Sequence, residues 1–217
     1  MDDKKIQLKL IKLGFLGDSS VGKSCICRSI MNLEFDMEMI ATIGSEKFET
    51  KFTLKNGEEI KLKFWDTAGE ERYRSMALNT LKAVSGVIIV FDFTCRSSFE
   101  NVNSWIELIK ENLNSPCLAL FGNKSDISKE YWDVTIEEAQ EFAQKNNIKL
   151  FLTSAKIKEG IDEGMSYIVN ETYEKIEQMK DYNIKNIKLE RKREDEYEYV
   201  DGCFGKKKKR KKKNKEK

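Results

Sequence analysis

The chain has 217 residues, a formal net charge of +2 and no histidine. That length suffices for one well-filled domain, and the lack of histidine excludes imidazole acid–base catalysis and His-ligated metal sites. The five cysteines show no C-x-x-C spacing and the first residues do not resemble a secretory signal, so we expect a reducing, cytosolic setting. No apolar run approaches the ~18 residues of a membrane span, and we expect a soluble or peripheral protein.

The charges are unevenly distributed along the chain. Residues 206–217 hold ten of the 39 basic residues and one of the 37 acidic ones, which gives this tail a net charge of +9. Residues 1–205 carry a net charge of −7. We therefore expect a mildly acidic body followed by a concentrated cationic tail.

Apolar periodicity predicts alternating strands and helices along the body. The expected helices begin at Cys25 and cover residues 98–111, 135–146 and 161 to about 179. The second and third strands form a hairpin around Asn56-Gly57. This alternation predicts an α/β fold, with a six-stranded, mostly parallel sheet, one antiparallel edge strand and helices on both faces. The expected strands cover residues 8–16, 48–54, 60–64, 87–91, 117–121 and 149–152.

The composition also predicts how the chain is divided. We expect one nucleotide-binding domain over residues 1–180. A charged linker without regular structure would follow over residues 181–205, and a disordered polybasic tail over residues 206–217.

The most informative stretch is Gly17-Asp18-Ser19-Ser20-Val21-Gly22-Lys23-Ser24, which fits G-x-x-x-x-G-K-[ST] between the first strand and the first helix. A glycine-bracketed loop that opens a helix directs several backbone N–H groups inward, and with the helix dipole they form a nest for phosphates. In this pattern Lys23 reaches the β- and γ-phosphate oxygens, and the Ser24 hydroxyl binds Mg²⁺. The alternative is a plain glycine turn between strand and helix.

Further polar motifs follow other strands, at the sheet edge where an open α/β fold binds its ligand. Asp66 can hold Mg²⁺ through water, and Gly69 can present its N–H to a γ-phosphate. In Asn123-Lys124-Ser125-Asp126 the aspartate can accept the ring N–H and the exocyclic amine of guanine. In Ser154-Ala155-Lys156 the Ala155 N–H can meet the guanine O6. Each motif alone is weak, but their order predicts a guanine-nucleotide site.

With these motifs the chain resembles the Ras superfamily of small GTPases, and within it the Rab family, over roughly residues 8–178. The resemblance implies GTP or GDP as ligand, with Mg²⁺ held by Ser24, Thr42 and Asp66. It also implies that Thr42 binds the ion only when the γ-phosphate is present. The residues implied in nucleotide binding are Ser19, Ser20, Val21, Gly22, Lys23, Ser24, Cys25, Thr42, Gly69, Asn123, Lys124, Asp126, Ser154, Ala155 and Lys156.

The chain also departs from the Rab pattern. The stretch from Thr42 to Phe48 is one residue longer than usual, and residues 80–83 lack the aromatic-rich Tyr-Tyr-Arg-Gly segment, so the usual Rab effectors are not expected to bind. No prenylation motif stands at the end of the sequence. Effectors, exchange factors and GTPase-activating proteins are expected to contact residues 42–48 and 70–81.

Glu70 stands where the family has the glutamine that orients the attacking water. Glutamine offers both an acceptor and a donor, whereas glutamate offers only acceptors and adds negative charge near the γ-phosphate. We expect slow GTP hydrolysis without an activating protein, unless a Glu70 of raised pKa acts as a base or a donor. The residues expected in catalysis are Lys23, Thr42, Gly69 and Glu70.

The sequence thus predicts a Rab-like GTP/GDP switch, with vesicle traffic implied by the resemblance. A guanine-nucleotide scaffold without significant hydrolysis is the alternative, and Asn123 and Asp126 disfavour an ATP-using kinase. The basic run 206–213 is expected to hold the protein reversibly on an anionic membrane surface, with an otherwise cytoplasmic location and no specific nucleic acid bound. A solvated tail, a nuclear-import signal or an RNA-binding patch would look alike. The nearby Cys203 can accept a palmitoyl chain or stay unmodified.

Overall fold

The computed structural model describes residues 8–35, 42, 45–67, 81–82, 84–195, 197–201 and 207–211, with side chains up to residue 182. A six-stranded sheet runs through the first of two compact units, which spans residues 1–173. The strand order is β2-β3-β1-β4-β5-β6, and only the β2–β3 pairing is antiparallel. The strands are β1 (Leu10–Leu16), β2 (Ser45–Thr53), β3 (Glu59–Thr67), β4 (Gly86–Asp92), β5 (Cys117–Asn123) and β6 (Lys149–Leu152).

This arrangement confirms the predicted mostly parallel sheet with one antiparallel edge strand. The β2–β3 hairpin turns at the expected place, because Asn56 and Gly57 supply the local chemistry of a tight turn. Gly57 has a φ of 83°, and the Asn56 side-chain oxygen accepts a hydrogen bond from the Glu58 N–H at 2.9 Å. Strand β2 begins at Ser45, three residues before the predicted start at Phe48.

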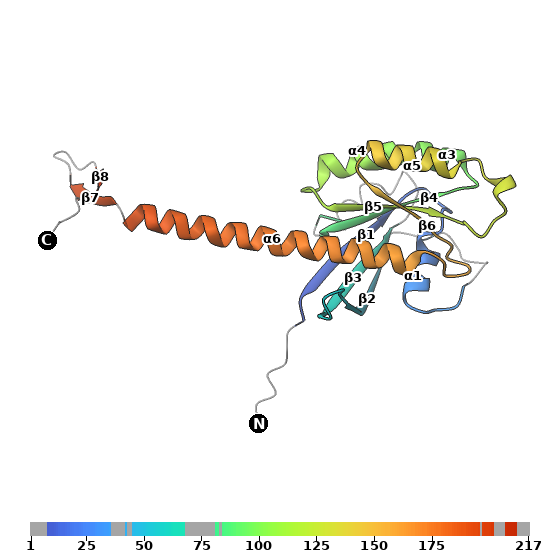
Figure 1. Cartoon of the computed structure of the whole chain (residues 1–217), viewed down its shortest axis with the longest axis horizontal. Helices are drawn as coiled ribbons and strands as arrows, with labels where there is room; N and C mark the ends of the chain where they lie inside the picture. Colours follow the sequence, from blue (N-terminus) through green and yellow to red (C-terminus); the bar gives the residue numbers. More distant parts are fainter. Residues whose placement is uncertain are drawn as a thin grey trace, which may run out of the picture. The chain divides into compact units, whose positions relative to one another are not determined.

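Helices cover both faces of the sheet, as Figure 1 shows. Helix α1 (Lys23–Ile30) and the first part of α6 (Ile161–Asp195) pack on one face. Helices α3 (Arg96–Glu100), α4 (Val102–Asn112) and α5 (Ile136–Lys145) pack on the other. The expected helix over residues 98–111 is therefore two helices, α3 and α4, that meet at Asn101.

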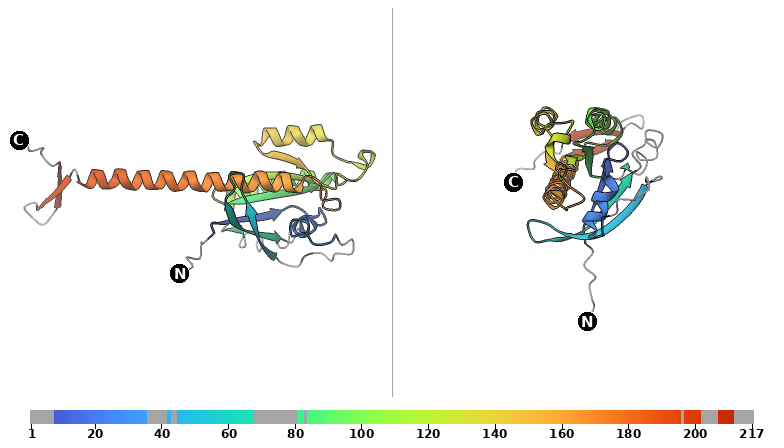
Figure 2. Two further views of the ribbon diagram at one scale, coloured as in Figure 1. Left: turned by 60° about the horizontal axis from the view of Figure 1, so that its bottom comes forward. Right: turned by 90° about the vertical axis from the view of Figure 1, so that its right-hand side faces the viewer.

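Two apolar clusters fill the spaces between the sheet and its helix layers. In β4, β5 and β6 alternate residues enter opposite clusters, since successive side chains of a strand point to opposite faces. In β4, for example, Ile88 and Val90 join the α1 and α6 cluster, while Val87 and Ile89 join the α3–α5 cluster. Because both faces are buried, the strand reads as a continuous apolar run. The two helix layers lie on either side of the sheet when it is viewed edge-on (Figure 2).

The second compact unit comprises residues 174–217. Helix α6 continues to Asp195, well past the predicted end near residue 179. Strands β7 (Tyr197–Asp201) and β8 (Lys207–Lys211) then pair antiparallel. The predicted division into a charged linker and a disordered polybasic tail stays a prediction. Residues 180–195 lack glycine and proline and are rich in Lys, Glu and Arg, which favour helix. The placement of the domain boundary at residue 180 stays a prediction.

Candidate nucleotide-binding site

The phosphate loop connects β1 to α1 and has the backbone conformations that an inward-facing nest requires. Gly17, Ser20 and Gly22 have φ values of 141°, 63° and 97°. A Cβ on Gly17 would lie 2.2 Å from the Val90 carbonyl oxygen, and one on Gly22 would lie 2.2 Å from the Asn123 side-chain nitrogen. The two glycines are therefore required both by conformation and by close approach to neighbouring groups.

Lys23 begins helix α1 and turns its side chain back over the loop. Its Nζ donates to the carbonyl oxygens of Gly17 at 2.9 Å and Asp18 at 2.7 Å. Burial lowers the Lys23 pKa to about 8, while the carboxylates of Asp66 and Asp18 oppose that shift. A buried ammonium held over a loop of inward N–H groups is suited to binding an anionic phosphate.

Three side-chain oxygens meet beside the loop, and they come from three separate segments. The Ser24 hydroxyl lies 2.8 Å from the Thr42 hydroxyl and 2.5 Å from Asp66 Oδ2, and the Thr42 hydroxyl donates to the same carboxylate oxygen at 3.2 Å. Asp66, at the end of β3, is fully buried, and this burial raises its pKa above the usual value. Its second oxygen, Oδ1, is buried without a hydrogen-bond partner. A buried carboxylate oxygen of this kind fits a cation ligand.

The composition of this oxygen cluster favours a hard cation of the Mg²⁺ type. Hydroxyl and carboxylate oxygens are ligands that Mg²⁺ accepts, and the ion usually takes its remaining ligands from water and substrate phosphates. Within the described part of the chain no group of three His, Cys, Asp or Glu side chains could hold a metal by itself. Three protein oxygens leave further ligand positions that water and nucleotide phosphates would fill, so the cluster fits an ion bound together with a nucleotide.

Asn123, at the end of β5, connects the phosphate loop to the loop after β6. Its side-chain nitrogen donates to the Val21 carbonyl oxygen at 2.8 Å, and its side-chain oxygen accepts the Ala155 N–H at 3.2 Å. The side chain is buried, and both halves of its amide are used. Asn123 thus holds two predicted nucleotide-binding segments in register with each other.

Asp126 and Lys124 flank the expected position of the guanine base, and each is held by a partner. The Ser154 hydroxyl donates to Asp126 Oδ1 at 2.6 Å. Lys124, which has a positive φ of 64°, forms an ion pair with Asp92 at the end of β4. The Asp126 carboxylate is therefore oriented by a neighbouring group of the protein, as a fixed acceptor for a base must be.

The remaining predicted residues are placed as follows. Ser19 and Ser20 are exposed at the tip of the loop, Cys25 is half-buried in α1, and Lys156 is exposed. Gly69 and Glu70 lie outside the described residues, as does most of the predicted partner segment 70–81. The roles of all these residues stay predictions.

Sequence reasoning missed two carboxylates that hold the site together. Asp92 holds Lys124, and its other oxygen accepts hydrogen bonds from the N–H and the hydroxyl of Thr94. Asp18, inside the phosphate loop itself, accepts hydrogen bonds from Asn101 and Trp105. Asp92 could have been found from the sequence, because it stands at the end of a buried strand. The role of Asp18 could not, because its partners lie more than 80 residues away in the sequence.

Comparisons with known proteins agree with this geometry. The Ras family model matches residues 12–174. The GTP-binding protein ypt3 of Schizosaccharomyces pombe is 37% identical over 165 residues, which cover 76% of each chain. The Ras-related protein Rab-13 of Rattus norvegicus is 36% identical over 163 residues, covering 75% of this chain and 79% of the relative, and Rab-13 of Bos taurus gives the same figures.

The matched region contains the whole six-stranded sheet apart from the first two residues of β1, together with every described residue of the nucleotide site. Fold, site geometry and relatives therefore agree. The chain belongs to the Ras family, and within it to the Rab-type small GTPases, which bind GTP and GDP and hydrolyse GTP.

Proposed function

We propose that this GTPase is a Mg²⁺-dependent switch that acts in vesicle traffic and whose intrinsic hydrolysis is slow. The observation that carries the switch is the cluster of Ser24, Thr42 and Asp66. It joins the phosphate loop, the segment before β2 and the end of β3, so a change at the nucleotide can reach the segment around Thr42 directly. Vesicle traffic is supported by the Rab names of the relatives alone.

Each residue of the cluster has a separate task in this proposal. Ser24 and Thr42 supply neutral oxygens, and Asp66 supplies the only carboxylate among the three. Together they would hold a Mg²⁺ ion, which would offset the negative charge of the phosphates. Thr42 retains its place only while the γ-phosphate is present, and its release after hydrolysis frees the segment that partners recognise.

The switch is tested by titrating fluorescent GDP and GTP analogues with and without Mg²⁺. For Thr42→Ala we expect GTP affinity to fall about tenfold in Mg²⁺, with GDP affinity nearly unchanged, because Thr42 is engaged only with the γ-phosphate. Thr50→Ala, a hydroxyl on the exposed part of β2, is the matched control. Equal loss of GDP and GTP affinity in Thr42→Ala would contradict this role.

Partner recognition is proposed for residues 42–48 and 70–81, through which effectors, exchange factors and activating proteins would act. Ser45, Glu46 and Lys47 are exposed at the start of β2, and Phe48 is half-buried and stacks on Phe64 with ring centroids 5.3 Å apart. This is an accessible polar segment next to an aromatic pair, a composition suited to protein recognition.

Slow hydrolysis follows from Glu70, which has no amide donor for the developing phosphoryl charge. Single-turnover hydrolysis of the wild type and of Glu70→Gln tests it, and we expect the glutamine variant to be about tenfold faster. Glu71→Gln is the matched control, because it removes one neighbouring negative charge without changing residue 70. A Glu70→Gln rate equal to that of the wild type would remove the inhibitory role of the carboxylate.

Membrane association is proposed through the basic run 206–213. None of the helices in the described residues is long and apolar enough to cross a membrane. Each Lys or Arg near an anionic leaflet contributes about 1 kcal/mol at most, so eight such residues suffice for reversible attachment. Co-sedimentation should pellet the protein with phosphatidylserine vesicles and not with phosphatidylcholine vesicles, and the binding should weaken in high salt. Equal pelleting with both vesicle types would exclude an electrostatic origin.

A further inference from the structure

We propose that Asn101 and Trp105 are positioning residues for the nucleotide phosphates, and that they act through the Asp18 carboxylate. Asp18 lies in the first half of the phosphate loop. The Trp105 indole N–H donates to its Oδ1 at 2.9 Å, and the Asn101 side-chain nitrogen donates to its Oδ2 at 2.7 Å. Both carboxylate oxygens are thus engaged by donors that belong to the α3–α4 region.

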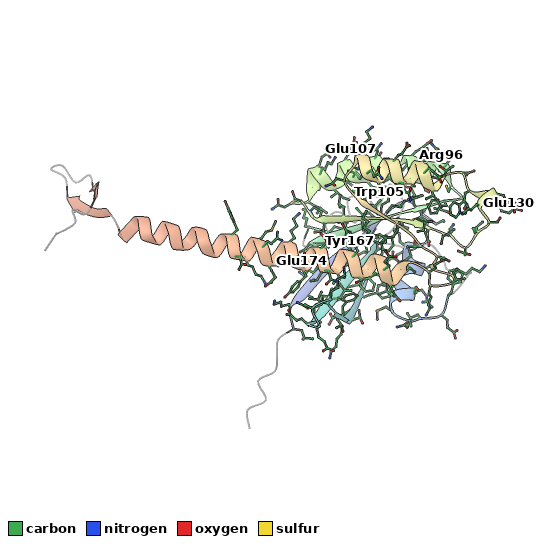
Figure 3. The ribbon with its side chains drawn as sticks, viewed as in Figure 1. Arg96, Trp105, Glu107, Glu130, Tyr167 and Glu174 are labelled. Carbon is green, nitrogen blue, oxygen red and sulfur yellow. The ribbon has the colours of Figure 1, made fainter. Side chains whose placement is uncertain are left out.

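One of the two donors is a core residue and the other lies at the surface. Trp105 is 1% exposed and packs between α4 and the sheet, where Figure 3 labels it. Asn101 has a helical backbone conformation, with φ −71° and ψ −12°, where α3 runs into α4. Its N–H donates to the Ser97 carbonyl oxygen at 3.0 Å, and its own carbonyl oxygen accepts the Trp105 N–H at 3.2 Å. The backbone of Asn101 is thus fixed by the helix, and its exposed side-chain amide is directed to Asp18.

Asp18 also contacts Lys23, the lysine at the end of the phosphate loop. The Asp18 carbonyl oxygen accepts a hydrogen bond from Lys23 Nζ at 2.7 Å. Asn101 and Trp105 fix the Asp18 side chain, and thereby the peptide unit to which Lys23 is bound. The loop is thus held at two residues along its length. Asn101 and Trp105 bind the Asp18 side chain, and Asn123 binds the Val21 carbonyl oxygen.

The charge of Asp18 gives a second reason for this arrangement. A carboxylate in a loop that binds phosphates would repel them if it were free to rotate inward. The two donors from Asn101 and Trp105 restrict this rotation, because each engages one of the carboxylate oxygens. Loss of either donor is therefore expected to loosen the loop and to allow a negative charge closer to the phosphates.

The test is the release rate of a fluorescent GDP analogue from the full chain in the presence of Mg²⁺. We expect release to be about threefold faster for Asn101→Ala and for Trp105→Phe, and about tenfold faster for the double variant, because each change removes one hydrogen bond to a charged group. Asn112→Ala is the matched control: its amide donates to the Leu108 carbonyl oxygen at 2.9 Å at the other end of the same helix. We expect it to release the analogue at the wild-type rate.

A double-mutant cycle separates positioning from a general loss of structure. In an Asp18→Ala background, Asn101→Ala and Trp105→Phe should change the release rate no further, because the group through which they act is gone. Additive effects in that background, or release from both single variants at the wild-type rate, would overturn the proposal. Exposed Asn101 keeps the test informative even if the core change at Trp105 lowers stability.

The inference rests on the proposed nucleotide site, and the two can fail separately. A wild-type protein that does not retain the GDP analogue would refute the site. Retention by the wild type, with unchanged release from the variants, would refute only the link through Asp18.

Discussion

The two ends of the nucleotide site differ in how their polar groups are satisfied. At the base end, Asn123 uses both halves of its amide on protein groups, and Asp126 is oriented by the Ser154 hydroxyl. At the metal end, Ser24 and Thr42 both converge on one oxygen of Asp66, whose other oxygen is buried without a hydrogen bond. The polar groups proposed to recognise the base are thus satisfied by the protein itself, whereas at the proposed metal end one buried carboxylate oxygen is left for a cation.

The largest effect is expected from Asp126→Asn, which removes the carboxylate proposed to accept hydrogen bonds from guanine. The amide can accept only through its oxygen and adds a donor where guanine also donates, so GDP affinity should fall by about 1,000-fold. The new donor suits the second carbonyl of xanthine, and the variant should prefer xanthosine diphosphate. Competition titrations against GDP measure both changes. Full retention of GDP affinity would show that Asp126 is not the base acceptor.

Much of this base end could be predicted, because it depends on short motifs at strand ends. The strands are continuous apolar runs, and the carboxyl ends of parallel strands meet at one edge of the sheet, so Asn123, Asp126 and Ala155 had to lie near the phosphate loop. The Asp66 position followed from the same logic. The mostly parallel sheet and the helices on both of its faces followed from the alternation of elements, whereas the order of the strands did not.

The connections between these motifs could not be predicted. No local pattern indicates that Asn101 donates to Asp18, which lies 83 residues away in the sequence. The extension of α6 to Asp195 was missed because charge density was read as a sign of disorder, although Lys, Glu and Arg are also good helix formers. Local composition alone is compatible with either helix or disorder in such a charged segment, and tertiary contacts decide between the two.

Removal of Mg²⁺ is expected to have the next largest effect, and it acts on the metal end. Chelation with EDTA should speed GDP release by about 100-fold, because the ion that would link the phosphates to the protein is removed. In Asp66→Asn the release should already be fast and should respond little to EDTA. Release that is fast in this variant yet still accelerated strongly by EDTA would place the ion elsewhere.

A smaller effect is expected from Ser154→Ala, which removes the group that orients Asp126. The Ser154 hydroxyl is fully buried and also accepts the Ile157 N–H at 3.3 Å, so its loss affects two contacts. We expect GDP affinity to fall about tenfold with no gain for xanthosine diphosphate, since the carboxylate itself remains. Ser128→Ala is the matched control, because that hydroxyl donates to the exposed Glu130 carboxylate at 3.1 Å. A gain in xanthosine diphosphate binding would argue that Ser154, and not Asp126, selects the base.

The smallest effect is expected from Asp92→Asn, which weakens the support of Lys124 at the base end. The Asp92 side chain is nearly buried, but the Lys124 side chain is 35% exposed. Solvent therefore screens much of the attraction between the two charges. Asparagine can keep the hydrogen bonds from Thr94 through its side-chain oxygen, and the change therefore tests the charge on Asp92 with little alteration of shape. We expect about a threefold loss of GDP affinity that shrinks as salt is raised. Glu138→Gln, which removes a carboxylate from its exposed pair with Arg96, should leave GDP affinity unchanged. If Asp92→Asn instead matched the loss seen in Asp126→Asn, the rigid support of Lys124 would contribute as much to base recognition as the acceptor itself.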